Sequence, residues 1–172
     1  MQKLTLPFIG REKKSSSDTY QYPLGYIFGT SEYQGGVATA QTFFQSSTTS
    51  VDNQTYYIPK SLTEVVVLGG DILRGAFDDC VNIETIILED GVSRIEEHAF
   101  WNCKGLTAMT IPTSVSYLGS WAFAYCSSLK TITYKGTLSQ WEALVAKSDR
   151  SYLGINSGVE KIVCSNGSIT VG

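Results

Sequence analysis

Trp121-Ala122-Phe123-Ala124-Tyr125-Cys126 is the last of three copies of one pattern in this chain. The earlier copies are Gly75-Ala76-Phe77-Asp78-Asp79-Cys80 and His98-Ala99-Phe100-Trp101-Asn102-Cys103, so the phenylalanine and the cysteine both recur every 23 residues. A fixed interval indicates one supersecondary unit that is stacked on copies of itself. An apolar residue three positions after each cysteine keeps the same interval: Ile83, Leu106 and Leu129.

Each unit combines a strand, a turn and a closing loop. Residues 83–88 read Ile-x-x-Ile-x-Leu, and this alternation predicts a strand with one face in the core. After a turn at Asp90-Gly91, Val92 and Ile95 form a second buried pair. Burial of about six or seven side chains contributes about 2 kcal/mol each, whereas ordering a unit costs about 30 kcal/mol. A single unit would not fold alone, so we expect neighbouring units to share one core.

Composition restricts the class of protein. The chain has 172 residues, which suits one domain, and a formal net charge of −3. Apart from Arg11-Glu12-Lys13-Lys14 its basic residues are scattered, so we expect no nucleic-acid binding. No apolar stretch is long enough to cross a bilayer, so no membrane insertion is expected, and residues 1–7 lack the apolar stretch of a signal peptide.

The N-terminus resembles the middle of a unit. Residues 1–7 align with residues 106–112, with proline last in both segments. We therefore interpret residues 1–10 as a partial repeat strand and expect the chain to be a fragment of a longer protein.

Three of the four cysteines occupy one equivalent position in each unit: Cys80, Cys103 and Cys126. Stacking would set them in a column, where neighbours come close to disulfide distance although three thiols cannot all pair. We favour a column of buried free thiols, because free cysteine behaves as a small hydrophobe. Cys164 lies outside the interval. With no Cys-x-x-Cys pair and one histidine, neither a zinc site nor any other metal or cofactor is expected.

Residues 111–126, from Ile111-Pro112 through Val115 and Leu118-Gly119 to Cys126, resemble the leucine-rich repeat of the BspA-like, Treponema pallidum type. The resemblance covers residues 58–136. It implies a curved repeat solenoid, rich in β-structure with short helical and turn segments, that has a parallel sheet on one side and a 23-residue repeat. It also implies a bacterial protein that is extracellular or on the cell surface, often associated with adhesion. The family shares no catalytic residues, so none are transferred.

The C-terminal residues 137–172 are predicted to cap the stack. Ser139-Gln140-Trp141-Glu142 has the pattern of a capping box and predicts a helix over about 139–147. Residues 159–171 predict a strand and a hairpin turning at Asn166-Gly167, which would close the sheet edge.

Residues 11–57 do not follow the repeat. They are rich in serine, threonine and aromatic residues, and we interpret them as a β-rich insertion of short strands with turns at Gly29-Thr30 and Gly35-Gly36. Two interpretations of their aromatic side chains remain open. They form a small satellite core, or they form an exposed patch that stacks on sugar rings or binds a protein partner. The candidate patch comprises Tyr22, Tyr26, Tyr33, Phe43 and Tyr56.

Signatures of catalysis are scarce, and we assign no catalytic residue. The single histidine, His98, follows two glutamates in what we interpret as a solvated turn, and Asp78-Asp79 is interpreted as an exposed loop. No phosphate-binding loop and no nucleophile elbow occur.

The positions between the apolar residues of each strand are predicted to face solvent and to line up across the sheet. They would form a nearly neutral surface of threonine and β-branched residues, with acid at one end and lysine at the other. These candidate binding positions are Thr63, Glu64, Val66, Glu84, Thr85, Ile87, Thr107, Ala108, Thr110, Lys130, Thr131 and Thr133.

We expect a non-catalytic adhesion module whose partner is a protein or glycan on a host or neighbouring cell, because such sheet faces commonly bind. Threonine is also a good strand former, which leaves open a structural spacer, bacterial or phage-associated, without its own ligand. A remote alternative is an enzyme with its site in residues 20–57.

Overall fold

The computed structural model describes residues 2–8, 24–44 and 51–171; of residues 25, 26, 42–44 and 51–53 it describes the backbone alone. The described elements are β1 (Lys3–Leu6), α1 (Gly25–Phe28), β2 (Gly36–Phe44), β3 (Val51–Pro59), β4 (Glu64–Ile72), β5 (Thr85–Ile95), β6 (Ala108–Ile111), β7 (Thr131–Tyr134), α2 (Leu138–Lys147), β8 (Lys161–Cys164) and β9 (Gly167–Thr170).

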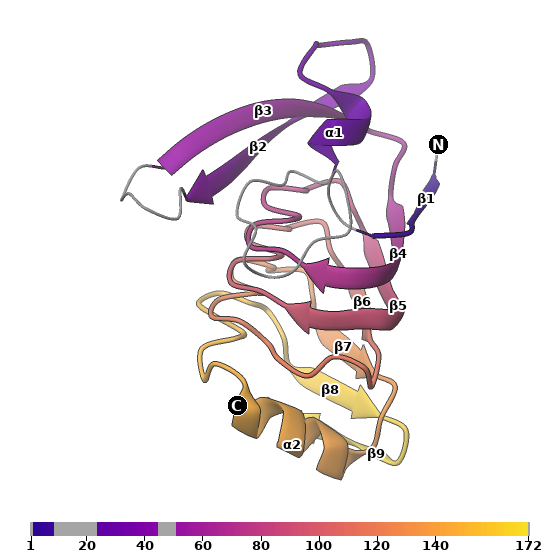
Figure 1. Ribbon diagram of the computed structural model, residues 1–172, viewed down its shortest axis with the longest axis vertical. Coiled ribbons are helices and arrows are strands. Elements are labelled where there is room, and N and C mark those ends of the chain that lie inside the picture. The colour runs from indigo at the N-terminus through magenta and orange to yellow at the C-terminus, as the bar shows by residue number, and fades with distance from the viewer. Residues whose placement is uncertain (1, 9–23, 45–50, 172) are drawn as a thin grey trace.

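One sheet runs the length of the molecule in the order β1-β4-β5-β6-β7-β8-β9. Its pairs are parallel from β1 to β8, and only β8 and β9 are antiparallel. Thr85 of β5 pairs with Ala108 of β6, which pairs with Thr131 of β7, so equivalent positions of successive turns are neighbours. Figure 1 shows these strands one above another, with α2 at one end and the β2–β3 hairpin with α1 at the other.

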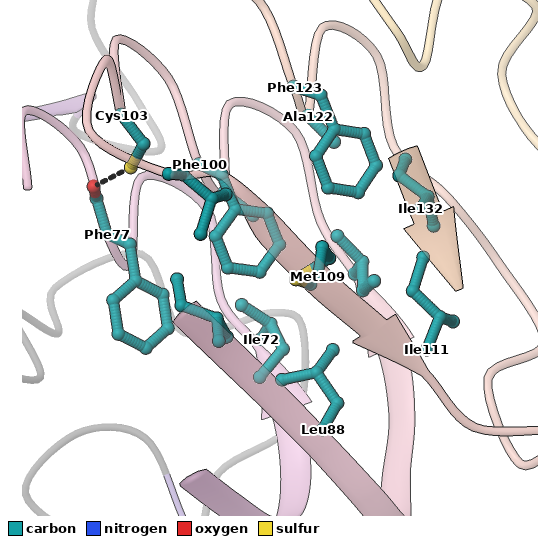
Figure 2. Packing of buried hydrophobic residues seen from close by; sticks show 14 of the residues in the cluster. Ile72, Phe77, Leu88, Phe100, Cys103, Met109, Ile111, Ala122, Phe123 and Ile132 are labelled. Carbon is teal, nitrogen blue, oxygen red and sulfur yellow. Dashed lines mark hydrogen bonds between the residues drawn. The ribbon is translucent and has the colours of Figure 1, made fainter. Parts of the chain in front are cut away.

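The core lies between this sheet and the closing loops that carry the Ala-Phe-x-x-Cys pattern. Phe77, Phe100 and Phe123 are fully buried, and their rings form one column. The Phe77–Phe100 and Phe100–Phe123 centroids are both 5.4 Å apart, with interplanar angles of 16° and 9°. In Figure 2 the three rings face strand residues such as Leu88 and Met109. The shared core predicted from the spacing is therefore confirmed.

Hydrogen bonds join the closing loops into a second ladder. The Phe77 amide donates to the Ala99 carbonyl at 2.8 Å, and the Phe100 amide donates to Ala122 at 2.9 Å. The thiols of Cys103 and Cys126 donate to the carbonyls of Phe77 and Phe100, each at 3.0 Å (the first is drawn in Figure 2).

All four cysteines are free and buried. The column of buried thiols expected from the sequence is confirmed, since a thiol satisfies a loop carbonyl while filling an apolar position.

The N-terminal segment adds a strand to the sheet. Residues 3–6 form β1, which pairs parallel with β4 from Lys3 opposite Glu64 to Leu6 opposite Val67. Leu6 belongs to the same buried core as the repeat strands.

The region before β4 holds a separate antiparallel hairpin, β2–β3, in which Gly36 pairs with Pro59 and Phe44 with Val51. Both strands have nine residues, longer than the short strands expected, and Gly36 begins β2 instead of lying in a turn. Leu24 and Ile58 are fully buried in the main core, and the buried Gln41 side chain donates to the Ala76 carbonyl at 3.1 Å. These contacts attach the hairpin to the stack.

The C-terminal cap differs in detail from the sequence prediction. The capping residue of α2 is Thr137, and Ser139 lies inside the helix: the Thr137 hydroxyl accepts from the Gln140 amide, and the Gln140 side chain accepts from the Thr137 amide. Thr137 caps the helix because its backbone is extended (φ −79°, ψ 167°), as an N-cap requires. In the hairpin, Cys164 pairs with Gly167, so the turn is Ser165-Asn166, one residue earlier than predicted.

Candidate binding surface

The outward face of the sheet consists of rows of side chains set by the strand register. One row joins Glu64, Thr85, Ala108 and Thr131, and the next joins Val66, Ile87, Thr110 and Thr133. Before the strands, backbone hydrogen bonds link Thr63 to Glu84 and Glu84 to Thr107. The alignment of eleven of the twelve candidate positions, all but Lys130, follows from these contacts, because paired parallel strands keep equivalent residues side by side.

Most of these residues reach solvent. Glu84, Thr107, Ala108, Lys130 and Thr133 are exposed, and Thr63, Glu64, Thr85, Ile87, Thr110 and Thr131 are half-buried. Val66 is the exception, with 6% of its surface exposed. Its partners in register are Thr5 and Ile87, and its prediction as a solvent-facing position is wrong.

Charged residues at the two ends of this face are paired. Lys3 Nζ lies 2.7 Å from Glu64 Oε1, and Lys130 Nζ lies 2.8 Å from Glu160 Oε1. Exposed pairs of this kind contribute about 0–1 kcal/mol to stability. Between the ends Glu84 is an exposed acid, and threonine hydroxyls and methyl groups dominate the rest of the face.

A second group of side chains lies on the closing loops, with Trp121 exposed and the others half-buried: Trp101, Trp121, Tyr125 and His98, here called the aromatic cluster. The indole rings of Trp101 and Trp121 stack with centroids 5.7 Å apart at 8°, and Tyr125 meets Trp101 edge-on at 4.9 Å. His98 meets Trp101 at 4.7 Å and Trp121 at 5.9 Å, both edge-on. Trp121 is 37% exposed.

Three members of the aromatic cluster have a left-handed backbone: φ is 56° at His98 and Trp121 and 60° at Tyr125. The position of His98 and Trp121 is held by Gly75 in the preceding turn, also left-handed with φ 64°. For a residue with a side chain this conformation costs about 1–2 kcal/mol. The loop backbone therefore favours glycine at a position where the chain carries Trp121.

Comparison with known proteins agrees with this architecture. A model of the BspA-type leucine-rich repeat region matches residues 49–162 with six copies of the repeat. The chain belongs to the BspA-type leucine-rich repeat family. No curated protein matches it. Among solved structures, a leucine-rich cell surface protein from Faecalibacterium prausnitzii A2-165 is similar at 18% identity and a TM-score of 0.40, over 84% of this chain and 50% of that one. This chain thus spans about half the length of that protein.

The leucine-rich-repeat fold with a parallel sheet, expected from the sequence resemblance, is confirmed by the BspA-type match and the strand pairing. Only α2 among the described helices is longer than one turn.

The aromatic patch predicted in the insertion is described only in part. Tyr22 lies outside the described residues. Tyr26 lies in α1 and Phe43 lies in β2, and for both residues the structure describes only the backbone. Tyr33 is 41% exposed, and Tyr56 is half-buried in β3. The aromatic cluster on the BspA-type closing loops was missed. The sequence feature that could have revealed this cluster is the presence of aromatic residues at the variable positions in and next to the Ala-Phe-x-x-Cys pattern.

Two interpretations of polar residues were wrong. His98 is not solvated: 20% of its side chain is exposed, with Nδ1 3.4 Å from Glu97 Oε1. Burial lowers the pKa of His98, opposed by the neighbouring Glu97 carboxylate and reinforced by Arg74. Asp78, expected in an exposed loop, is only 5% exposed.

Within the described part of this BspA-type chain, no group of three or more histidine, cysteine, aspartate or glutamate residues is arranged to hold a metal ion. None of the described helices has the length and apolar character needed to cross a membrane.

Proposed function

We propose that this chain is a non-catalytic binding module of a bacterial surface or secreted protein, and that it binds a protein or glycan of a host or neighbouring cell. The observation that carries the proposal is the outward face of β5–β7, where Thr85, Thr110, Thr131 and Thr133 stand in register, uncharged and accessible. Membership of the BspA-type family supports a repeat module of the adhesion type.

The face is suited to an extended partner. Its rows follow the direction of stacking, so a polymer laid across the strands would meet one side chain of each row at every turn, such as Thr110 and Thr133 in successive strands. We infer that the turns form a curved solenoid with a 23-residue period, which would lengthen such a face with every added repeat. Residues that pair between neighbouring parallel strands and are 23 positions apart in the sequence, such as Ala108 and Thr131, support this inference.

The test is a pair of matched double variants. Thr110→Lys/Thr133→Lys places two charges on the face, whereas Ser127→Lys/Ser128→Lys adds the same charges at exposed residues of a closing loop. Both proteins and the unmodified chain would be applied to a glycan array and to an array of extracellular matrix proteins. We expect the first variant to bind its target at least tenfold more weakly and the second to bind normally.

Two results would count against the proposal. If the unmodified chain binds nothing on either array, the chain is a structural spacer, for which the good strand-forming propensity of threonine suffices. If both double variants bind as well as the unmodified chain, the ligand does not contact the sheet face.

A further inference from the structure

The aromatic cluster is placed where stability alone would favour other residues. Gly75 and Asn102 occupy the positions equivalent to Trp121 and Tyr125 one or two turns earlier, with φ of 64° and 58°. Glycine and asparagine adopt this conformation most readily. Exposed aromatic residues held in a strained backbone point to a role in recognition.

Polar groups lie beside the Trp121 backbone. The Trp121 amide donates to the Ser151 carbonyl at 2.8 Å, and the hydroxyls of Ser120 and Ser151 lie 2.9 Å apart. The Ser151 hydroxyl and amide both donate to the Asp149 carboxylate. These hydrogen bonds lower the pKa of Asp149, so the carboxylate is charged and its remaining lone pairs can accept from a ligand.

We propose that the aromatic cluster is a second binding site, for a neutral saccharide: one sugar ring stacks its C–H face on Trp121, and sugar hydroxyls bond to Asp149, Ser120 and Ser151. An apolar ring beside hydroxyl and carboxylate groups matches a sugar, which has an apolar face and a polar rim. The site is independent of the sheet face.

The size of the cluster favours a sugar over a protein. A stable protein interface covers about 800 Å² on each partner. Here Trp121 is the one ring of the cluster exposed by more than a third. A single exposed ring is far smaller than such an interface and suits one or two sugar rings.

The repeat itself supplies variants that the fold accommodates. Trp121→Gly copies the residue found at this position two turns earlier, and Tyr125→Asn copies the residue of the previous turn. Trp121→Phe keeps a ring and serves as the conservative control. Circular dichroism would verify that each variant is folded.

The probes are neutral hexasaccharides of β-1,4-glucose, α-1,4-glucose and β-1,4-N-acetylglucosamine, titrated into the full chain by calorimetry. We expect saturable binding of at least one of them. Trp121→Gly should bind at least tenfold more weakly, Tyr125→Asn more weakly by a smaller factor, and Trp121→Phe within about threefold of the unmodified chain.

Four results would overturn the proposal. The first is that none of the saccharides binds, and the second is that Trp121→Gly binds as tightly as the unmodified chain. The third is a dimer in sedimentation that Trp121→Gly converts to a monomer, which would make the cluster an interface between copies. Sugar binding lost in Thr110→Lys/Thr133→Lys but kept in Trp121→Gly would also overturn it, and would assign the sugar to the sheet face instead.

Discussion

Replacing Phe100 by alanine tests the shared core at its centre. Phe100 is fully buried and stacks on a ring in the turn before it and on a ring in the turn after it, Phe77 and Phe123. Removing a buried phenylalanine side chain costs about 3–5 kcal/mol. Domains of this size are stable by about 5–15 kcal/mol, so Phe100→Ala should lose a large part of the free energy of unfolding.

The column provides a matched control. Among the described residues Phe123 is equally buried but stacks on one phenylalanine instead of two. An aromatic pair contributes about 0.5–1.5 kcal/mol beyond burial. Phe100→Ala should therefore destabilise the protein by that amount more than Phe123→Ala does. Phe100→Leu keeps most of the apolar volume and should cost about 1.5 kcal/mol, which leaves a measurable transition if the alanine variant does not fold.

Urea unfolding followed by tryptophan fluorescence measures these differences. Trp101 and Trp121 report on the closing loops, whereas Trp141, 3% exposed in α2, reports on the cap. Linear extrapolation gives the free energy of unfolding in water. A loss below about 1.5 kcal/mol for Phe100→Ala, or a larger loss for Phe123→Ala, would refute the reasoning that successive turns depend on one another through this column.

Three further outcomes are expected. Thr137→Ala should lower the free energy of unfolding by about 1 kcal/mol, while Ser139→Ala should leave it almost unchanged; equal effects would contradict the capping geometry. A thiol reagent should leave the native cysteines unmodified and label all four in urea, because they are buried and burial raises the pKa of Cys80, Cys103 and Cys164. Burial lowers the folded-state pKa of His98, so its charged form is disfavoured in the folded state and stability should fall as pH drops through 6.5. His98→Asn should show a weaker pH dependence of the urea midpoint; the same slope in both proteins would contradict this assignment.

The repeat interval and the alternation of apolar residues were sufficient to predict strands with one face in the core, the core shared by successive units and the column of buried thiols, whereas the parallel sheet was implied by the family resemblance. These features depend on positions that recur in every turn, and periodicity reports such positions directly. Val66 shows where this information ends. Its position alternates like that of Thr110, and both residues have a paired strand on each side, yet Val66 is buried and Thr110 is half-buried. Alternation therefore predicts which face a side chain lies on but not how far it is covered.

The start of α2 shows a second limit. Both Thr137-x-x-Gln140 and Ser139-x-x-Glu142 fit the pattern of a capping box, and the sequence alone does not distinguish two such patterns two residues apart. The chain direction on leaving β7 decides between them, because it gives Thr137 the extended backbone of an N-cap. That direction is a property of the packed sheet.

The aromatic cluster was missed for a related reason. Trp101 stacks on Trp121, which is neither its sequence neighbour nor its equivalent in the next turn. When the repeats are aligned position by position, Trp101 is equivalent to Asp78 and Ala124, so the alignment shows only that the residue at this position varies. It does not show that Trp101 contacts Trp121. Diagonal contacts between turns require the loop geometry and cannot be read from the alignment of repeats.

The hydrogen-bond ladder explains why strained residues persist on the closing loops. In each turn the left-handed residue donates its amide to the following turn: Gly75 to Glu97, His98 to Ser120 and Trp121 to Ser151, at 2.8–3.2 Å. The backbone conformation is thus imposed by stacking and stays the same whether the side chain is absent, an imidazole or an indole. Because the ladder and the phenylalanine column hold the fold, this outer position can change its chemistry from turn to turn at a cost of about 1–2 kcal/mol. A repeat protein built in this way can acquire a binding surface on its loops without altering its sheet.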